Sequence, residues 1–326
     1  MSIRIFLLGL FINFSTSTFV TAASVANTYS LSDYSPEMFS KTFMAANTKR
    51  IPEAQYQIAI RYNHGLGVPV RSQRSINWYL RAARSEHVLA MYTLGTRYHS
   101  GVGVKKDNLE GFYWLQKAAI KGHVESQYKT AYNFLNGRGT NTDYKSAIYW
   151  LNQASKNNHA LAQYTLYTLY RDGSVVKKNG STAYKWLRLA ANNEHTTSMF
   201  LIAQQYLQRS TPKKWEYAKA HKWIRKSAEK NHVASQYSLA SMYNTGLGVK
   251  KDLSSAALWY RAAAKLNHPE SQYNLAIMYF RGEGIELNHK SAAFWLKKYL
   301  SNSDTARFST NNIRIAQQLL AKLTSQ

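Results

Sequence analysis

Seven of the eight tryptophans in this chain fall at a nearly constant spacing. The step between successive members is 36 residues, except once, where it is 37, and the ladder consists of Trp78, Trp114, Trp150, Trp186, Trp223, Trp259 and Trp295. A fixed period of this length is typical of an α-solenoid, in which stacked two-helix repeats bury a continuous core between neighbours. The ladder therefore predicts an all-α fold with a long binding surface and does not favour a catalytic cleft.

The ladder divides the chain into repeats flanked by shorter segments. In each repeat the fifth and eleventh residues are aromatic, which places an apolar face on a first helix of about 12 residues. In most repeats a glycine ends this helix, because glycine tolerates the left-handed conformation. We expect an N-terminal cap segment at 23–51, a C-terminal capping helix at 305–326, and seven repeats at 52–87, 88–123, 124–159, 160–195, 196–232, 233–268 and 269–304.

Two stretches of the second repeat resemble a known family. They read MYTLGTRYHSGVGVKKD over residues 91–107 and WLQKAAIKGH over residues 114–123. Both are similar to the Sel1-like repeat, a relative of the tetratricopeptide repeat with a longer, glycine-bearing loop. The resemblance spans about residues 52–300. It implies a right-handed α/α superhelical solenoid of about seven repeats with a role in protein–protein contacts, and in exported bacterial members often in envelope processes or host interaction.

The N-terminus has the pattern of an export signal. Residues 1–4 carry one positive charge, residues 5–14 form a short apolar run, and residues 20–22 supply small side chains for cleavage. An apolar run of about 10 residues is too short to span a bilayer. We expect a signal peptide over 1–22, an exported protein that is periplasmic or secreted, and no integral membrane span. An uncleaved interfacial helix is the alternative.

The charge of the chain is strongly positive. It has 42 Lys and Arg against 17 Asp and Glu, a formal net charge of +25. Such an excess predicts attraction to polyanions, such as anionic lipid headgroups or acidic surface polymers, although a long repeat array also has much solvated surface. We do not expect nucleic acid as a partner, because export would separate the protein from the cell's DNA and no recognition motif is present.

Six of the ten histidines end a repeat and suggest a ladder of metal sites. They are His87, His123, His159, His195, His232 and His268. Packed helices lie about 8–10 Å apart, whereas zinc binds nitrogen at about 2.0–2.1 Å, so equivalent histidines should not converge. We therefore expect no metal and no cofactor, and we interpret these residues as turn residues whose imidazoles bond free carbonyls near a helix end.

The sequence offers little that points to catalysis. The chain has no cysteine, which excludes thiolate metal sites and a cysteine nucleophile, and with them the β-lactam chemistry described for some cysteine-rich members of the family. No carboxylate pair or Ser-His-Asp arrangement stands out. We therefore do not expect an enzyme.

The exposed side of the first helix is the best candidate for a binding face. The sixth, ninth, tenth and thirteenth residues of a repeat share one face because they are three or four apart. Arginine and tyrosine are common interface anchors, so we expect a protein partner along the concave face to contact Arg61, Arg97, Tyr132 and Arg281. Simple solvation of these residues is the alternative.

The fifth repeat departs from the pattern. Its loop lacks glycine and leads into Lys213, Lys214 and Trp215, the one tryptophan outside the ladder. Either the array bends there or a basic and aromatic loop is displayed to a partner. These three residues complete the set of candidate partner-binding residues.

Together these features favour a non-enzymatic, monomeric interaction scaffold of the bacterial envelope or secreted, with host interaction or virulence as one role. A basic protein that binds an envelope polysaccharide or lipid headgroup is the second hypothesis, and an envelope hydrolase the third.

Overall fold

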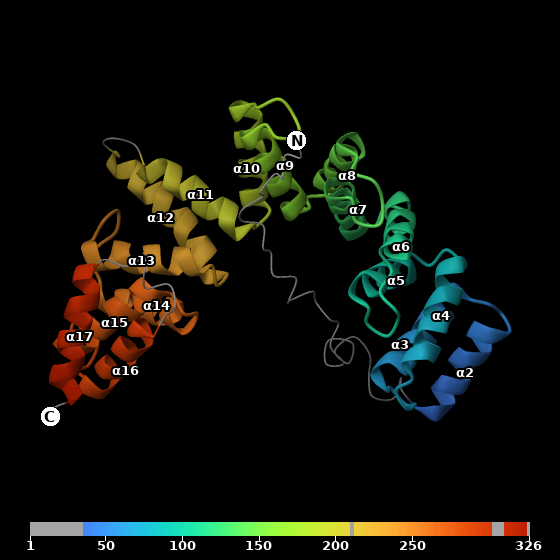
Figure 1. Cartoon of the computed structure of the whole chain (residues 1–326), viewed down its shortest axis with the longest axis horizontal. Helices are drawn as coiled ribbons and strands as arrows, with labels where there is room; N and C mark the ends of the chain where they lie inside the picture. The colour runs from blue at the N-terminus through green and yellow to red at the C-terminus, as the bar shows by residue number, and fades with distance from the viewer. Residues whose placement is uncertain (1–34, 209–211, 302–309, 325–326) are drawn as a thin grey trace, which may run out of the picture. The chain divides into compact units, whose positions relative to one another are not determined.

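The computed structural model describes residues 35–208, 212–301 and 310–324. The signal peptide expected over 1–22 lies outside them. The described residues form sixteen α-helices and no strand (Figure 1). They belong to two compact units, Met1–Ala147 and Ile148–Gln326, each of which is described by itself. The predicted all-α repeat fold is confirmed.

In the first unit, a cap helix precedes first and second helices in alternation. Each helix packs against the next along the chain from α2 to α7. Their bounds are α2 (Pro36–Asn47), α3 (Pro52–His64), α4 (Ser72–Arg84), α5 (Val88–Ser100), α6 (Asn108–Ile120) and α7 (Val124–Asn136), and α8 (Tyr144–Lys156) runs across the boundary into the second unit.

In the second unit, the same alternation continues and ends in one extra helix. Neighbouring helices again pack in chain order from α9 to α17. Their bounds are α9 (Ala160–Asp172), α10 (Gly180–Asn192), α11 (Thr196–Leu207), α12 (Lys214–Glu229), α13 (Val233–Thr245), α14 (Leu253–Lys265), α15 (Pro269–Arg281), α16 (His289–Leu300) and α17 (Thr310–Thr324).

First helices end where the sequence places a glycine. Six of them have a left-handed glycine C-cap with φ between 64° and 78°, namely Gly65, Gly101, Gly137, Gly173, Gly246 and Gly282. In the fifth repeat α11 ends instead at Gln208 with φ −83°, because no glycine is available there. Asp107 and Asp252 accept hydrogen bonds from backbone N–H groups at the starts of α6 and α14, as expected of N-cap residues.

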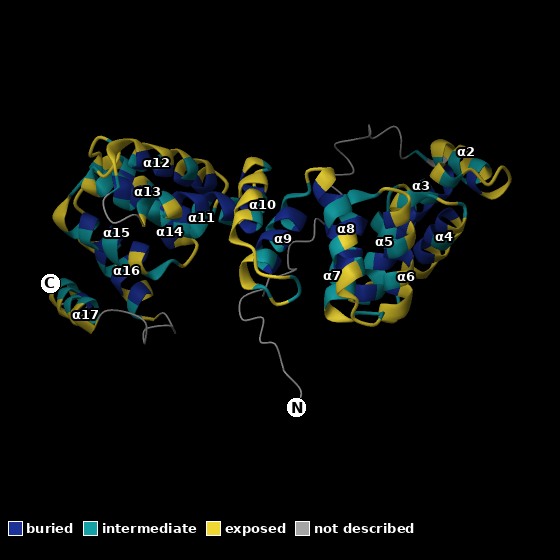
Figure 2. Ribbon diagram, turned by 90° about the horizontal axis from the view of Figure 1, so that it is seen from above, coloured by how far each residue is buried: buried dark blue, intermediate teal, exposed yellow. Residues whose placement is uncertain are grey.

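The core of each repeat combines an indole with small residues. Trp78 and Trp114 are 7% exposed, and the other five ladder tryptophans are half-buried. Ala118 and Ala119, four and five residues after Trp114, are buried and leave room for the neighbouring helix. In Figure 2 the buried parts of the helices, in dark blue, lie mainly where neighbouring helices of each unit face one another.

The two end helices complete the apolar packing of their units. Ser35 caps α2, and the α2 rings Phe39 and Phe43 lie 6.0 Å from Tyr62 and 5.5 Å from Trp78. At the other end α17 buries Ala316 and packs Leu319, Leu320 and Leu323 against the last repeat.

Candidate functional site

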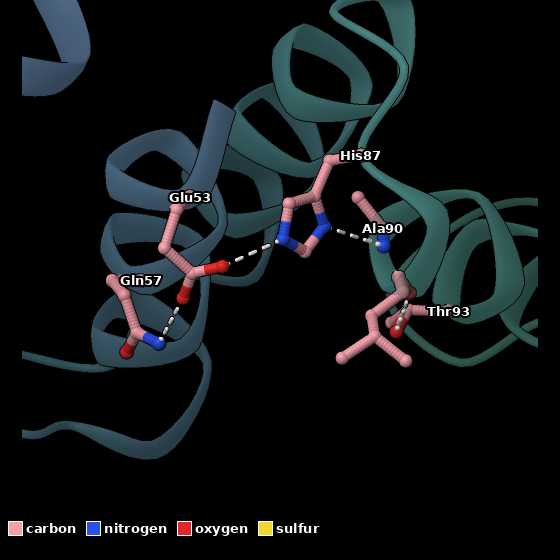
Figure 3. Close-up of polar contacts among 6 residues, drawn as sticks. Glu53, Gln57, His87, Ala90 and Thr93 are labelled. Atoms are coloured by element: carbon pink, nitrogen blue, oxygen red, sulfur yellow. Dashed lines mark hydrogen bonds and ion pairs between the residues drawn. The ribbon is translucent and has the colours of Figure 1, made fainter. Parts of the chain in front are cut away.

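The repeat-ending histidines are N-caps of the next first helix. In His87, Nδ1 accepts a hydrogen bond from the backbone N–H of Ala90 at 3.2 Å, and Nε2 lies 2.9 Å from the Glu53 carboxylate (Figure 3). The other five caps accept from the corresponding N–H groups; they are His123, His159, His195, His232 and His268.

The prediction that these imidazoles bond carbonyls is therefore wrong, although their place at a helix end is right. The reason is the backbone before each histidine. Glu86 adopts a left-handed φ of 63°, which turns the N–H of His87 back to the carbonyl of Ala82 at 3.0 Å. The backbone satisfies the carbonyl ends of the second helix, and the ring is left to serve the N–H groups of the next helix.

The histidine rings are also packing elements. His87 stacks on Tyr56 at 4.4 Å and His195 lies 4.3 Å from Tyr164, the aromatic fifth residue of the repeat it ends. Burial lowers the pKa of His195 to about 4 and the pKa values of His123, His232 and His268 below the ordinary value. Within residues 35–208, 212–301 and 310–324, no cluster of three His, Asp or Glu side chains that could hold a metal ion is present.

In most repeats the tenth residue of the first helix does not belong to the exposed face, and the exposed Gln205 of α11 is the exception. Arg61 is only 5% exposed, and its guanidinium lies 5.8 Å above the ring of Phe39 on the cap helix. Asn133, Met242 and Met278 occupy the same position and are buried as well. The exposed place predicted for Arg61 is therefore wrong, because position ten packs against the preceding element instead of facing solvent.

Arg97 and Asn133 show what position ten contacts. Arg97 donates a hydrogen bond to Asn63 at 2.6 Å and lies 5.2 Å above the ring of Tyr79. Asn133 bonds His99 at 3.0 Å, and burial lowers the pKa of His99 to about 4. In both cases position ten contacts position twelve of the preceding repeat. Arg97 is half-buried and holds two repeats together.

The rest of this face consists of the sixth, ninth and thirteenth residues: the thirteenth is exposed in six of the seven repeats, whereas the sixth and ninth are half-buried. Tyr132, at position nine of α7, is half-buried. Arg281, at position thirteen of α15, is exposed, and its Nη1 lies 3.6 Å from Glu283. Of the four first-helix candidates, Arg281 is therefore the most open to solvent.

A pocket lies on this face in the last repeat. Its volume is 330 Å³, and its walls come from α13, α14, α15 and α17. Asn274, Ile277 and Arg281 of α15 contribute positions six, nine and thirteen, and Leu319 of α17 closes the opposite side. Apolar walls with a few polar groups are typical of binding pockets. The sequence analysis found Arg281 but not the pocket, because the docking of α17 is a tertiary contact.

The basic candidates of the fifth repeat lie at the start of α12, apart from Arg281. Lys213, Lys214 and Trp215 are all exposed, Trp215 by 46%. Glu216 is buried and accepts a hydrogen bond from the backbone N–H of Lys213 at 2.8 Å, which fixes the start of the helix. Three residues of the preceding loop, 209–211, lie outside the described part of the chain.

One repeated polar contact was missed in the sequence. The fourth residue of five repeats is a buried glutamine whose amide donates to a carbonyl at the end of the preceding helix, as in Gln163 to Ser155 at 3.1 Å. The set is Gln55, Gln127, Gln163, Gln236 and Gln272. Its recurrence at one position was the available signal.

A family model settles what kind of repeat this is. The model of the Sel1 repeat matches residues 52–87, 88–123, 124–159, 160–195, 196–232, 233–268 and 269–299. The chain is a Sel1-repeat protein. Proteins built from Sel1 repeats generally act as protein-interaction scaffolds.

Two solved structures of Sel1-repeat proteins are similar to this one. The first is c5321, described as a protective antigen present in uropathogenic Escherichia coli strains; it is 26% identical with a TM-score of 0.66 over 89% of this chain. This chain spans 63% of the length of c5321. The second is a Sel1-repeat protein from Oxalobacter formigenes, 26% identical with a TM-score of 0.65, covering 82% of this chain and 76% of its own. No curated protein matches the chain.

Among the described residues of this Sel1-repeat protein, no helix is both long enough and apolar enough to cross a bilayer.

Proposed function

We propose that this Sel1-repeat protein is a non-catalytic scaffold that binds a segment of a partner protein against the face of its first helices formed by positions six, nine and thirteen. The observation that carries the proposal is the 330 Å³ pocket on α15, beside the exposed guanidinium of Arg281. The pocket offers an apolar floor for an anchoring side chain, and interface energy concentrates at such anchors.

The chemistry of the pocket indicates the segment it would take. Ile277 and Met278 of α15 and Leu319 of α17 provide apolar surface, and Asn274 provides a side-chain amide. Arg281 is the one basic residue in the lining; it lies 3.6 Å from Glu283, which also lines the pocket, and such an exposed pair is weak. We therefore expect an apolar side chain in the pocket with a carboxylate beside it on the partner segment.

A site-specific crosslink tests this function. A photoreactive amino acid replaces Ile277 in the pocket, or, as the control, Asn77 on the exposed outer side of α4. The protein captured at position 277 is identified by mass spectrometry, purified, and titrated against the unmodified chain and two variants.

Charge reversal decides the outcome. Arg281→Glu should weaken binding of the purified partner by tenfold or more, since a charge-assisted pair is worth about 1.5–3 kcal/mol. Lys290→Glu makes the same charge reversal at an exposed site of the same repeat and should leave the affinity for the partner within about twofold. Equal affinities for both variants, or capture at position 77 and not at 277, would contradict the proposal.

We further propose that the protein is exported and acts at the bacterial envelope or outside the cell. The pattern of residues 1–22 supports this, and so does the similarity to c5321, whose description as a protective antigen is compatible with host contact. Mass spectrometry of the protein recovered from the periplasm and from the medium checks it. An intact N-terminus in the cytoplasmic fraction alone would rule the proposal out.

A further inference from the structure

The second helix of the fifth repeat has an unusually basic outer face. In α12 and its two flanking residues, seven cationic side chains are exposed: Lys213, Lys214, Lys219, Lys222, Arg225, Lys226 and Lys230. Figure 2 shows exposed residues along this helix. The opposite face, with Ala220, Ile224 and Ala228, is buried. The helix is therefore held by its apolar side while its cations face solvent.

Few acidic groups neutralise these cations. Arg225 pairs with Glu229 at 2.9 Å, and Lys230 pairs with Glu194 at 2.8 Å. Over the part of the chain that the structure describes, no ion pair engages Lys219, Lys222 or Lys226. Exposed pairs such as the two formed by Arg225 and Lys230 are weak, so the field of this face is positive.

An exposed tryptophan stands in line with the lysines. Trp215, Lys219, Lys222 and Lys226 follow one another at steps of four, three and four residues, which places them on one stripe of α12. Lys219 Nζ lies 4.6 Å above the indole of Trp215, and Tyr206 meets the same indole edge-on at 6.3 Å. The ring therefore has two neighbours, and the residue remains 46% exposed.

The neighbouring repeats of the same unit extend this face with apolar residues. The residue just before each ladder tryptophan of this unit is exposed, and in repeat order it is Tyr149, Lys185, Lys222, Leu258 and Phe294. Leu258 is 62% exposed and Phe294 51%. A partner that forms only ion pairs would make no favourable contact with these apolar side chains. The headgroup region of a bilayer accommodates lysine, indole and aliphatic groups together.

We propose that the outward face of the second helices in the second unit, centred on α12, binds the surface of an anionic phospholipid bilayer. Lysines 219, 222 and 226 contact lipid phosphates, and Trp215 enters the headgroup region. The pocket uses the buried Tyr260 of α14, whereas this face uses the exposed Leu258 of the same helix, so the chain can bind a membrane and a protein segment at the same time. Failure of the membrane proposal would leave the proposed binding of a protein segment unaffected, and the reverse also holds.

Co-sedimentation with vesicles tests the proposal on the full chain. Vesicles of phosphatidylcholine with a third of phosphatidylglycerol are compared with vesicles of phosphatidylcholine alone. The variant Lys219→Gln/Lys222→Gln/Lys226→Gln is matched by Lys105→Gln/Lys106→Gln/Lys145→Gln, which removes the same charge from exposed sites of the first unit. All chains keep the same N-terminus, so differences between variants come from the substituted faces.

The α12 variant should bind the anionic vesicles about tenfold or more weakly than the unmodified chain, because each lysine near an anionic surface adds to the attraction. The matched variant should lose less than about threefold. Replacing the same three lysines by arginine should retain binding, and circular dichroism should show unchanged helix for all variants.

Trp215→Ala separates a bilayer from a dissolved polyanion. It should weaken binding to anionic vesicles by about threefold to tenfold and leave binding to soluble polyphosphate unchanged. Equal loss in the two lysine variants, equal binding to both kinds of vesicle, or binding to polyphosphate without binding to vesicles would each overturn the proposal.

Discussion

At the scale of single residues, a histidine that ends a repeat makes several kinds of contact. His195 accepts a hydrogen bond from the backbone N–H of Ser198, contacts the Ser198 hydroxyl at 2.8 Å and lies against the ring of Tyr164. The hydrogen bond from the backbone N–H requires an unprotonated Nδ1, and the other two contacts are compatible with a neutral imidazole. Burial, helped by the nearby His232, lowers its pKa to about 4.

This makes stability depend on pH in a definite direction. The unfolded chain protonates His195 near its ordinary pKa of about 6.5, whereas the folded chain resists protonation down to about 4. Stability is therefore complete above about pH 6.5 and falls as the pH drops toward 4, by about 2 kcal/mol at pH 5 for this site. His195→Asn keeps a capping side chain and should flatten the decline in melting temperature between pH 7 and pH 5.

The exposed His289 provides the control for this measurement. His289→Asn should leave the pH dependence of the melting temperature as it is in the unmodified chain. A slope for His195→Asn equal to that of the unmodified chain would show that the site contributes nothing to the pH dependence.

At the scale of the elements, helix pairs fit because small residues sit opposite large ones. Gly111 of α6 illustrates this, since a Cβ there would lie 2.7 Å from the ring of His99 on α5. Five of the other six repeats have alanine at the position of Gly111, and one of these five, the sixth repeat, has Asn244 at the position of His99. In the second repeat the glycine leaves room for the imidazole.

Gly111→Ala should lower the free energy of unfolding by about 1–3 kcal/mol, because a methyl group has no room beside the imidazole. Adding His99→Asn should restore most of the loss. Gly180→Ala, whose Cβ would meet no atom within 4 Å, should be neutral or slightly stabilising. Chemical denaturation measures all three, and a double variant no more stable than Gly111→Ala alone would refute the explanation.

At the scale of the molecule, successive helices contact one another within each unit, from α2 to α7 and from α9 to α17. The stability of such an array is the sum of contributions from single repeats and from the interfaces between them. A destabilising substitution should therefore affect mainly its own repeat and the adjacent ones. The last repeat depends on α17, which packs Leu320 beside the buried Leu296 and Tyr299.

Leu320→Ala should therefore raise amide hydrogen exchange in α15 and α16 by about tenfold and leave α9 and α10 unchanged. Gln317→Ala, on the exposed side of the same helix, is the matched control and should change neither region. An equal rise in α9 and α10 would mean that the unit unfolds as a whole and that the packing of α17 is not a local matter.

Much of the fold and some of the candidate site could be predicted from the sequence. The aromatic, glycine and tryptophan positions recur because every repeat needs residues that end its helices and residues that pack closely between them. Asp107 and Asp252 could be placed for that reason. The burial of Arg61 could not be predicted in this way, because it depends on Phe39 of the cap helix, which lies outside the repeat.

The sequence by itself determined the all-α repeat fold, since a fixed spacing of indoles and glycines admits one local solution repeated along the chain. Only the tertiary structure decided which side chains remain available to a partner. Position ten turned inward against the preceding repeat, α17 closed one side of a pocket, and the cations of α12 faced solvent. Exposure depends on what packs beside a residue, and periodicity within one helix cannot encode its neighbours.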